Sequence, residues 1–140
     1  MRLEGNPIHV LAVGAGAAEL GGAAETADDL LGALARLADG GIDVVVLSLD
    51  LPDGQGVDAV RALTERAPDV PVIALTADGL VDEALAAGAT DVVPEDGGGE
   101  LLTRAIRYAV SLRRLRAEIR HLQGRLADAD PDAQPQGGSP

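Results

Sequence analysis

Short apolar runs recur along the first hundred residues, and polar or glycine-rich segments separate them. Three runs consist of aliphatic and β-branched side chains, as expected of strands buried on both faces of a parallel sheet. They are Ile8–Val13, Val44–Leu47 and Pro71–Thr76. Thr90–Val93 is a shorter run of the same kind. Glycine and proline follow or precede each run and mark turns. The pattern therefore predicts short buried strands at regular intervals.

Amphipathic stretches fill the intervals between these runs. Thr26–Ala38 has a leucine stripe, with Thr26 as the expected N-cap. Val57–Ala67 is the next expected helix, Val81–Ala87 is a short one, and a long helix begins near Glu100. Strands that alternate with helices at this spacing predict a parallel sheet with helices on both faces.

The residues that follow the Val44–Leu47 strand resemble a known family. Ser48 comes directly after this run, and Pro52 and Gly56 follow it four and eight residues later. This stretch resembles the centre of a response-regulator receiver domain, where a similar strand delivers an aspartate followed at these distances by proline and glycine. The resemblance covers about residues 8–110. It implies an α/β fold of the flavodoxin-like type, with a five-stranded parallel sheet in the order 2-1-3-4-5.

The segment after the first strand is short for this family. A receiver has a full helix and a second strand there, whereas only residues 14–25 are available before the helix expected at Thr26. We therefore expect the first helix to be shortened or missing, with Gly22–Glu25 as the rest of the second strand. A lost helix would uncover apolar sheet surface, and we expect the prolonged C-terminal helix, from the same or a partner chain, to cover it.

The resemblance also implies a phosphorylation site, and this chain has lost most of it. A working receiver needs an acidic pair for Mg²⁺, an acceptor aspartate, a hydroxyl and a lysine, because carboxylates hold the cation and the lysine pairs with the phosphate. The matching positions here are Gly14, Ala15, Ser48, Thr76 and Glu95. Only the threonine fits, since a serine hydroxyl cannot form an acyl phosphate and Glu95 reverses the charge of the lysine. We expect no aspartyl phosphorylation, metal or cofactor at this site.

Two alternatives at the same end of the sheet remain open. Asp50 is a candidate substitute acceptor, but it lies two residues beyond Ser48, about 6–7 Å farther along an extended chain. The second alternative is a receiver-derived sensor that binds a small molecule where the acidic site has been emptied, around Gly14, Ser48 and Thr76.

A lower alternative is a nucleotide-binding enzyme. Gly14 and Gly16 follow a strand, as a dinucleotide-binding turn requires. The third glycine position is Glu19, whose carboxylate would repel a pyrophosphate. His9 and His121 are far apart in the sequence, so they suggest neither a metal site nor a catalytic dyad.

From Leu101 onward the apolar positions recur with a different period. Their spacing alternates between four and three residues, which is an a/d heptad. The seam consists of Leu101, Ala105, Tyr108, Leu112, Leu115, Ile119, Leu122 and Leu126. This narrow stripe predicts a two-helix coiled coil and a homodimer, with the helix orientation left open. The alternative is a receiver's last helix followed by a linker to a further domain.

Charge and composition narrow the choice of function. The formal net charge is −12; residues 1–100 carry four arginines against nineteen acids, whereas residues 101–127 carry seven arginines against Glu118 alone. An acidic globule argues against nucleic-acid binding by this chain alone. The chain has no cysteine, so thiol chemistry is excluded. We find no signal-peptide pattern and no bilayer-length apolar run, and we expect a cytoplasmic protein without membrane contact.

We interpret residues 1–110 as a degenerate receiver, or pseudo-receiver, 111–129 as a helical extension that forms a coiled coil, and 130–140 as a disordered tail. The expected function is a phosphorylation-independent module of bacterial signalling, not an enzyme. It would act through homodimerisation and contact with another signalling or regulatory protein.

Overall fold

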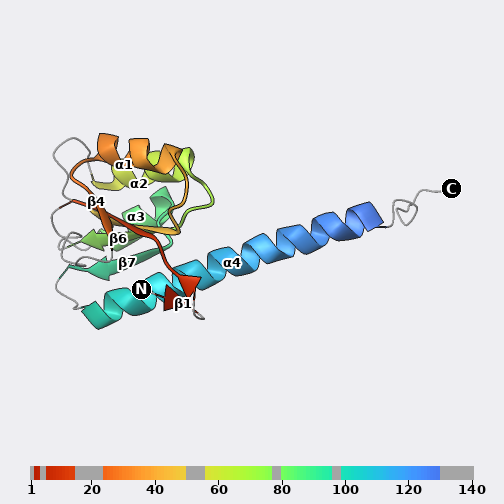
Figure 1. The fold of residues 1–140 in the computed structure, drawn as a ribbon. Helices are drawn as coiled ribbons and strands as arrows, with labels where there is room; N and C mark the ends of the chain where they lie inside the picture. The colour runs from red at the N-terminus through yellow and green to blue at the C-terminus, as the bar shows by residue number, and fades with distance from the viewer. Residues whose placement is uncertain are drawn as a thin grey trace.

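A five-stranded parallel sheet forms the centre of the computed structural model, which describes residues 2–3, 6–14, 24–49, 56–76, 80–95 and 99–129. Its strand order is β4-β3-β5-β6-β7, which confirms the order 2-1-3-4-5 expected from the resemblance. The strands are β3 (Val10–Val13), β4 (Glu25–Ala27), β5 (Val44–Ser48), β6 (Val72–Thr76) and β7 (Asp91–Pro94). Figure 1 shows the sheet between a layer of helices and one long helix.

Four helices accompany the sheet in the described ranges. They are α1 (Leu30–Ala38), α2 (Gly56–Arg66), α3 (Val81–Ala87) and α4 (Gly99–Ala129). A small antiparallel hairpin of β1 (Arg2–Leu3) and β2 (Asn6–Pro7) precedes the sheet and lies beside α4. The sequence pattern did not predict this hairpin, because two-residue strands leave no periodic signal.

The start of α1 differs from the sequence prediction. Thr26 is not an N-cap: it lies within β4 and pairs with Ala12 of β3. The cap is Asp29, whose Oδ1 accepts a hydrogen bond of 2.8 Å from the backbone N–H of Gly32. The second strand therefore begins at Glu25, not at Gly22, in the described part of the chain. The expectation of a shortened first helix falls on residues 15–23, which lie outside the described residues.

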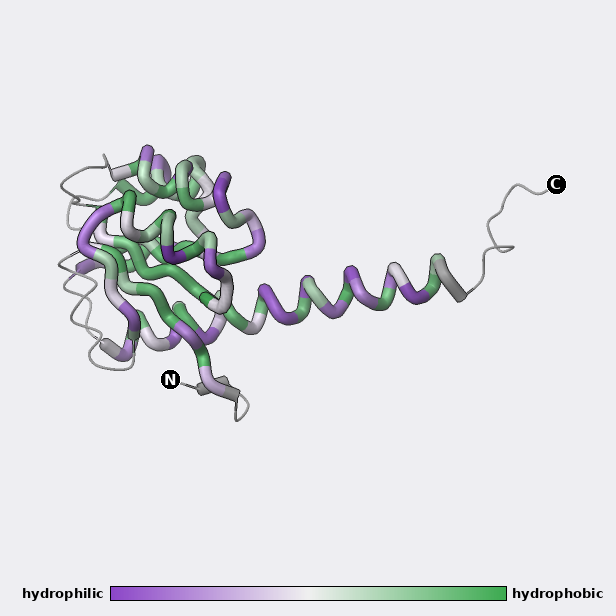
Figure 2. Tube along the Cα trace, turned by 45° about the horizontal axis from the view of Figure 1, so that its top comes forward, coloured by the Kyte–Doolittle hydropathy of each residue, from purple (hydrophilic) through white to green (hydrophobic). Residues whose placement is uncertain are grey.

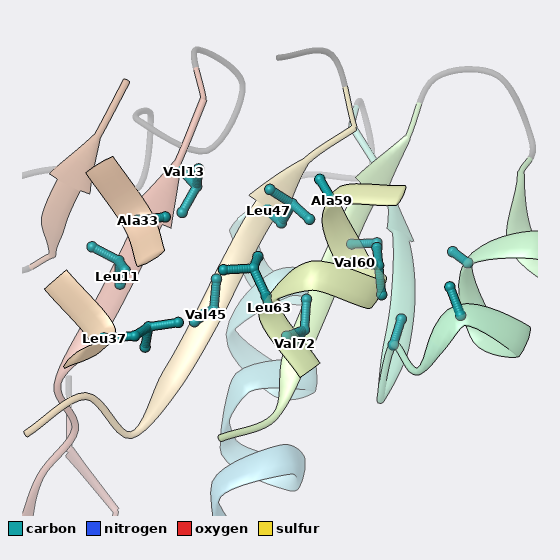
Figure 3. Packing of buried hydrophobic residues seen from close by; sticks show 14 of the residues in the cluster. Leu11, Val13, Ala33, Leu37, Val45, Leu47, Ala59, Val60, Leu63 and Val72 are labelled. Carbon is teal, nitrogen blue, oxygen red and sulfur yellow. The ribbon is translucent and has the colours of Figure 1, made fainter. Parts of the chain in front are cut away.

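Three helices cover one face of the sheet. Alternate residues of β3, β5 and β6 point toward α1, α2 and α3, because successive side chains of a strand face opposite sides. Figure 3 shows Ala33 and Leu37 of α1, and Val60 and Leu63 of α2, packed toward the strands. With a single aromatic residue in the whole chain, this core consists of Leu, Val, Ile and Ala.

The other face of the sheet is covered by α4. The covering side chains come from the first half of the helix and pack on β3, β5, β6 and β7: Leu102, Ala105, Ile106, Ala109 and Val110. All of them precede Ser111, and the side chains of residues 115–127 are exposed. Within the described residues, the prolonged part of the helix therefore does not cover the sheet of its own chain. Coverage by the helix of a partner chain stays a prediction.

Beyond Val110 the helix leaves the body as a projecting rod (Figures 1 and 2). Two ion pairs connect the first turns of this projecting part to the body. Arg113 donates to Oδ1 of Asp43 at 3.2 Å, and Arg120 donates to Oδ1 of Asp69 at 3.3 Å. Asp43 also accepts a bond of 2.8 Å from the backbone N–H of His9, so one carboxylate joins the chain before β3 to α4. In the described ranges, no helix is both long and apolar enough to cross a bilayer.

Candidate functional site

The described residues that the sequence analysis assigned to a phosphorylation site lie at the carboxyl edge of the sheet. Parallel strands end at the same edge, so the residues after β3, β5, β6 and β7 come together there. Gly14 follows β3, Ser48 ends β5, Thr76 ends β6 and Glu95 follows β7. Ala15, the fifth predicted position, lies outside the described residues, as do Asp50 and its neighbours up to residue 55.

Ser48 and Glu95 form a direct hydrogen bond. The hydroxyl Oγ of Ser48 donates to Oε2 of Glu95 at 3.3 Å. Ser48 is 2% exposed, whereas Glu95 is at the surface. The backbone N–H of Glu95 donates to the carbonyl oxygen of Thr76 at 3.2 Å, which continues the β6–β7 ladder and fixes Glu95 beside the end of β6. The two substituted positions are therefore joined to each other.

The pair of Ser48 and Glu95 carries a negative charge, whereas a phosphate-binding site needs positive charge. A carboxylate at Glu95 attracts hydrogen-bond donors and repels anions. Thr76 is 7% exposed and ends β6, the strand next to that of Ser48, at the same carboxyl edge of the sheet. Within the described residues, no three His, Cys, Asp or Glu side chains are grouped so that they could hold a metal ion.

Gly14 has a conformational reason to be glycine. Its φ is +91°, in the left-handed region that side-chain-bearing residues rarely adopt. Its N–H donates to the carbonyl oxygen of Ala27 at 3.0 Å and so extends the β3–β4 ladder by one bond. A turn at the end of a strand explains this glycine without a nucleotide; Gly16 and Glu19 lie outside the described residues.

The predicted dimerisation residues divide into two groups. Ala105 is buried against the sheet and Leu112 is half-buried where α4 leaves the body. The others are exposed large apolar side chains: Leu101, Tyr108, Leu115, Ile119, Leu122 and Leu126. We call the last four of these the apolar stripe. It lies on the projecting part of α4, where no other described element covers it (Figure 2).

A groove of about 410 Å³ lies where α4 leaves the body. Its walls are α4, the segment 68–71 before β6 and the turn after α3, and three arginines line it: Arg113, Arg116 and Arg120. We call it the arginine groove. The sequence analysis missed it, although three arginines at intervals of three and four residues indicate one side of a helix.

One further ion pair supports the edge strand. Arg36 of α1 donates from Nε and Nη2 to the two carboxylate oxygens of Glu25 on β4, at 2.6 and 2.9 Å. This hydrogen bonding lowers the pKa of Glu25 and raises the pKa of Arg36. Both side chains lie at the surface, so solvent screens the pair.

Comparison with known proteins identifies a single family. The family model described as response regulator receiver domain matches residues 6–107. Regulatory protein LuxO of Vibrio cholerae is 44% identical over 71 residues, which cover 49% of this chain and 16% of LuxO. The transcriptional activator DevR/DosR of Mycobacterium tuberculosis is 38% identical over 78 residues, covering 54% of this chain and 36% of that protein. The chain thus spans about a third or less of the length of these relatives.

Solved structures agree with the fold. The signal receiver domain of an HD domain-containing protein from Pseudomonas fluorescens superposes with a TM-score of 0.71 at 21% identity, covering 80% of this chain and 93% of that domain. The beryllofluoride-activated NtrC4 receiver domain dimer gives a TM-score of 0.63 at 28% identity, covering 75% of this chain and 98% of that one.

Proposed function

The chain belongs to the response-regulator receiver domain family, and from this premise we propose that it is a receiver that signals without phosphorylation, through dimerisation and contact with another signalling or regulatory protein. Its family places it in two-component signalling, and receiver domains are signalling modules, not enzymes. The observation that carries the proposal is the hydrogen bond between Ser48 and Glu95.

The physical reason lies in the charge at the site. Phosphoryl transfer depends on cations that offset the charge of the transferred group, and on an acceptor in line with it. Here a glutamate accepts from the serine that replaces the acceptor, and Gly14 offers no ligand for Mg²⁺. A phosphoryl donor would meet a carboxylate where a receiver has its lysine. We therefore propose that the conformation of this domain is fixed without phosphate.

Dimerisation is the second part of the proposal, and the apolar stripe supports it. Leu115 and Leu126 are 57% and 72% exposed in the single chain. Burial of such a side chain stabilises a complex by roughly 1.5–3 kcal/mol. Burial of the four stripe residues of each chain is enough to offset an association free energy of about 4–15 kcal/mol and to give a dimer of moderate affinity. The NtrC4 receiver domain is described as a dimer in its activated form, which is consistent with this proposal.

The small-molecule sensor receives no support from the described residues. Ser48 and Thr76 are almost completely buried, and the serine hydroxyl is engaged with Glu95. The nucleotide-binding alternative depends on residues outside the described ranges.

Sedimentation equilibrium of the full chain, with and without acetyl phosphate and Mg²⁺, tests the proposal. We expect a dimer whose affinity the phosphoryl donor does not change. The Leu115→Ala/Leu122→Ala variant should weaken the dimer at least about a hundredfold, because it removes apolar burial from both chains. The matched control is Arg107→Ala/His121→Ala, since both positions are exposed on α4 and lie off the stripe. Monomers at high concentration, or association that requires acetyl phosphate, would contradict the proposal.

A further inference from the structure

The charges beside the apolar stripe distinguish between the two ways of pairing it. In a parallel pair, each residue lies level with its own copy, and Glu118 lies across from the partner's Gln123. Ser111 then lies across from the partner's Arg116. Within the described helix, which ends at Ala129, neither contact joins opposite charges, and each arginine lies level with its own copy.

Antiparallel pairing of the same stripe gives a different result. Leu115 then aligns with the partner's Leu126, and Ile119 aligns with the partner's Leu122, so every layer holds two large aliphatic side chains. In this register Glu118 lies across from the partner's Arg125. Twofold symmetry repeats the contact, so the dimer gains two ion pairs that parallel pairing lacks.

The arginine groove lies on the flank of α4 that this arrangement would use. Arg113 and Arg120 already have Asp43 and Asp69 as partners. For Arg116, the structure gives no carboxylate partner among the described residues, so the groove has an excess of positive charge. In the antiparallel register, the end of the partner's helix comes level with the groove. The sequence there is acidic, with aspartates at 128, 130 and 132.

The length of the projecting helix is also compatible with antiparallel pairing. The stripe extends over twelve residues from Leu115 to Leu126, about 17 Å at the helical rise. Two antiparallel rods would overlap over this length with their bodies at opposite ends, so the acidic bodies, each of formal net charge −15 over residues 1–100, stay apart.

We propose that a second copy of this chain pairs with α4 in the antiparallel direction, with Glu118 opposite the partner's Arg125 and the partner's acidic end in the arginine groove. This inference rests on the dimerisation proposed above and adds its direction, register and electrostatic partner.

Cysteine cross-linking tests the direction, because the natural chain has no cysteine. Two differently tagged single variants, Leu115→Cys and Leu126→Cys, are mixed and oxidised. The antiparallel dimer yields a disulfide between them, whereas Leu126→Cys alone does not cross-link, since its two sulfurs are separated by about 16 Å along the axis. Self-cross-linking of Leu126→Cys, with no disulfide between the two variants in the mixture, would establish a parallel dimer and overturn the inference while the proposed dimerisation stands.

Charge exchange provides a second test that leaves the stripe intact. Glu118→Arg should weaken the dimer on the order of tenfold, because it replaces two attractive contacts by two repulsive ones. The double variant Glu118→Arg/Arg125→Glu should restore the affinity to within about twofold. In a parallel dimer these residues do not meet, so the double variant would not recover and the inference fails. If the unaltered chain is monomeric, the proposed dimerisation fails as well.

Discussion

The hydroxyl of Ser48 donates a hydrogen bond of 3.3 Å to Glu95, and the sequence analysis predicts that these are the two positions where a receiver has its acceptor aspartate and its lysine. In a working receiver the two side chains would carry opposite charges. Here a neutral donor faces a carboxylate, so the contact persists without a cation. The two substitutions are therefore complementary to each other and form one local interaction.

The first prediction concerns phosphoryl transfer. Incubation with acetyl phosphate and Mg²⁺ should leave the intact mass of the chain unchanged, because Gly14 supplies no metal ligand and Glu95 repels the donor. The Ser48→Asp variant should also stay unmodified, since it restores the acceptor alone. A phosphoryl adduct that disappears in Asp50→Asn would contradict this prediction and would identify Asp50 as a substitute acceptor.

The second prediction concerns the stability of the Ser48–Glu95 contact. Ser48→Ala should lower the free energy of unfolding by about 1 kcal/mol, because a nearly buried hydrogen bond is lost. Urea denaturation followed by circular dichroism measures the change. Ser111→Ala is the matched control: this serine is exposed on α4, and its replacement should change stability by no more than about 0.5 kcal/mol. Equal effects of the two variants would contradict a specific role for the contact.

The third prediction concerns truncation. A chain that ends at Val110 should fold and remain monomeric, because every side chain of α4 that covers the sheet precedes Ser111. Circular dichroism should show a cooperative thermal transition, and sedimentation should show loss of the dimer. An aggregated product would indicate that the projecting part of α4 does cover the body, in its own chain or in the partner.

The fourth prediction concerns two glycines. Gly124→Ala should strengthen the dimer by up to about 1 kcal/mol per chain, because alanine favours the helix and the added Cβ meets nothing within 4 Å. Gly88→Ala is the contrasting variant. There φ is +118° and the new Cβ would lie 3.0 Å from the side chain of Thr64, so we expect the body to lose more than about 1 kcal/mol. A weaker dimer in Gly124→Ala would contradict a helical pairing role.

The fifth prediction concerns the ion pair between Arg36 and Glu25. The pKa of Glu25 is lowered by this arginine, so the pair stabilises the fold at neutral pH, and its contribution is lost as the pH falls through that lowered pKa. In Arg36→Gln the pKa of Glu25 should rise toward the ordinary range, as measured by NMR titration. Arg61→Gln, which removes a more exposed ion pair with Asp58, should leave the pKa of Glu25 unchanged.

The sequence was sufficient for β3, β5 and β6, because these strands are buried at every position and therefore continuously apolar. Val44–Ser48, buried at every position, is the clearest case. The sequence was insufficient at Thr26, because threonine suits both an N-cap and a strand. The pairing of Thr26 with Ala12 places it in a strand. Asp29, three residues later, is as good a cap. Local preference cannot resolve a choice that depends on a strand elsewhere in the chain.

The same limit applies to the site. The loss of the acceptor is a prediction from Ser48 alone, whereas the hydrogen bond of Ser48 to Glu95 joins residues that are 47 positions apart. The arginine groove depends on where α4 crosses the loop before β6, which no periodicity encodes. The heptad spacing did indicate the exposed stripe, because a helix repeats its surface regularly.

The continuity of α4 has a mechanical consequence. The same helix covers the sheet up to Val110 and then projects for about 28 Å to Ala129 without interruption. A tilt of roughly 10° about Ile106 would displace Ala129, about 35 Å farther along the helix, by about 6 Å. A partner protein that slightly displaces the start of α4 would thereby move its far end by the diameter of a side chain.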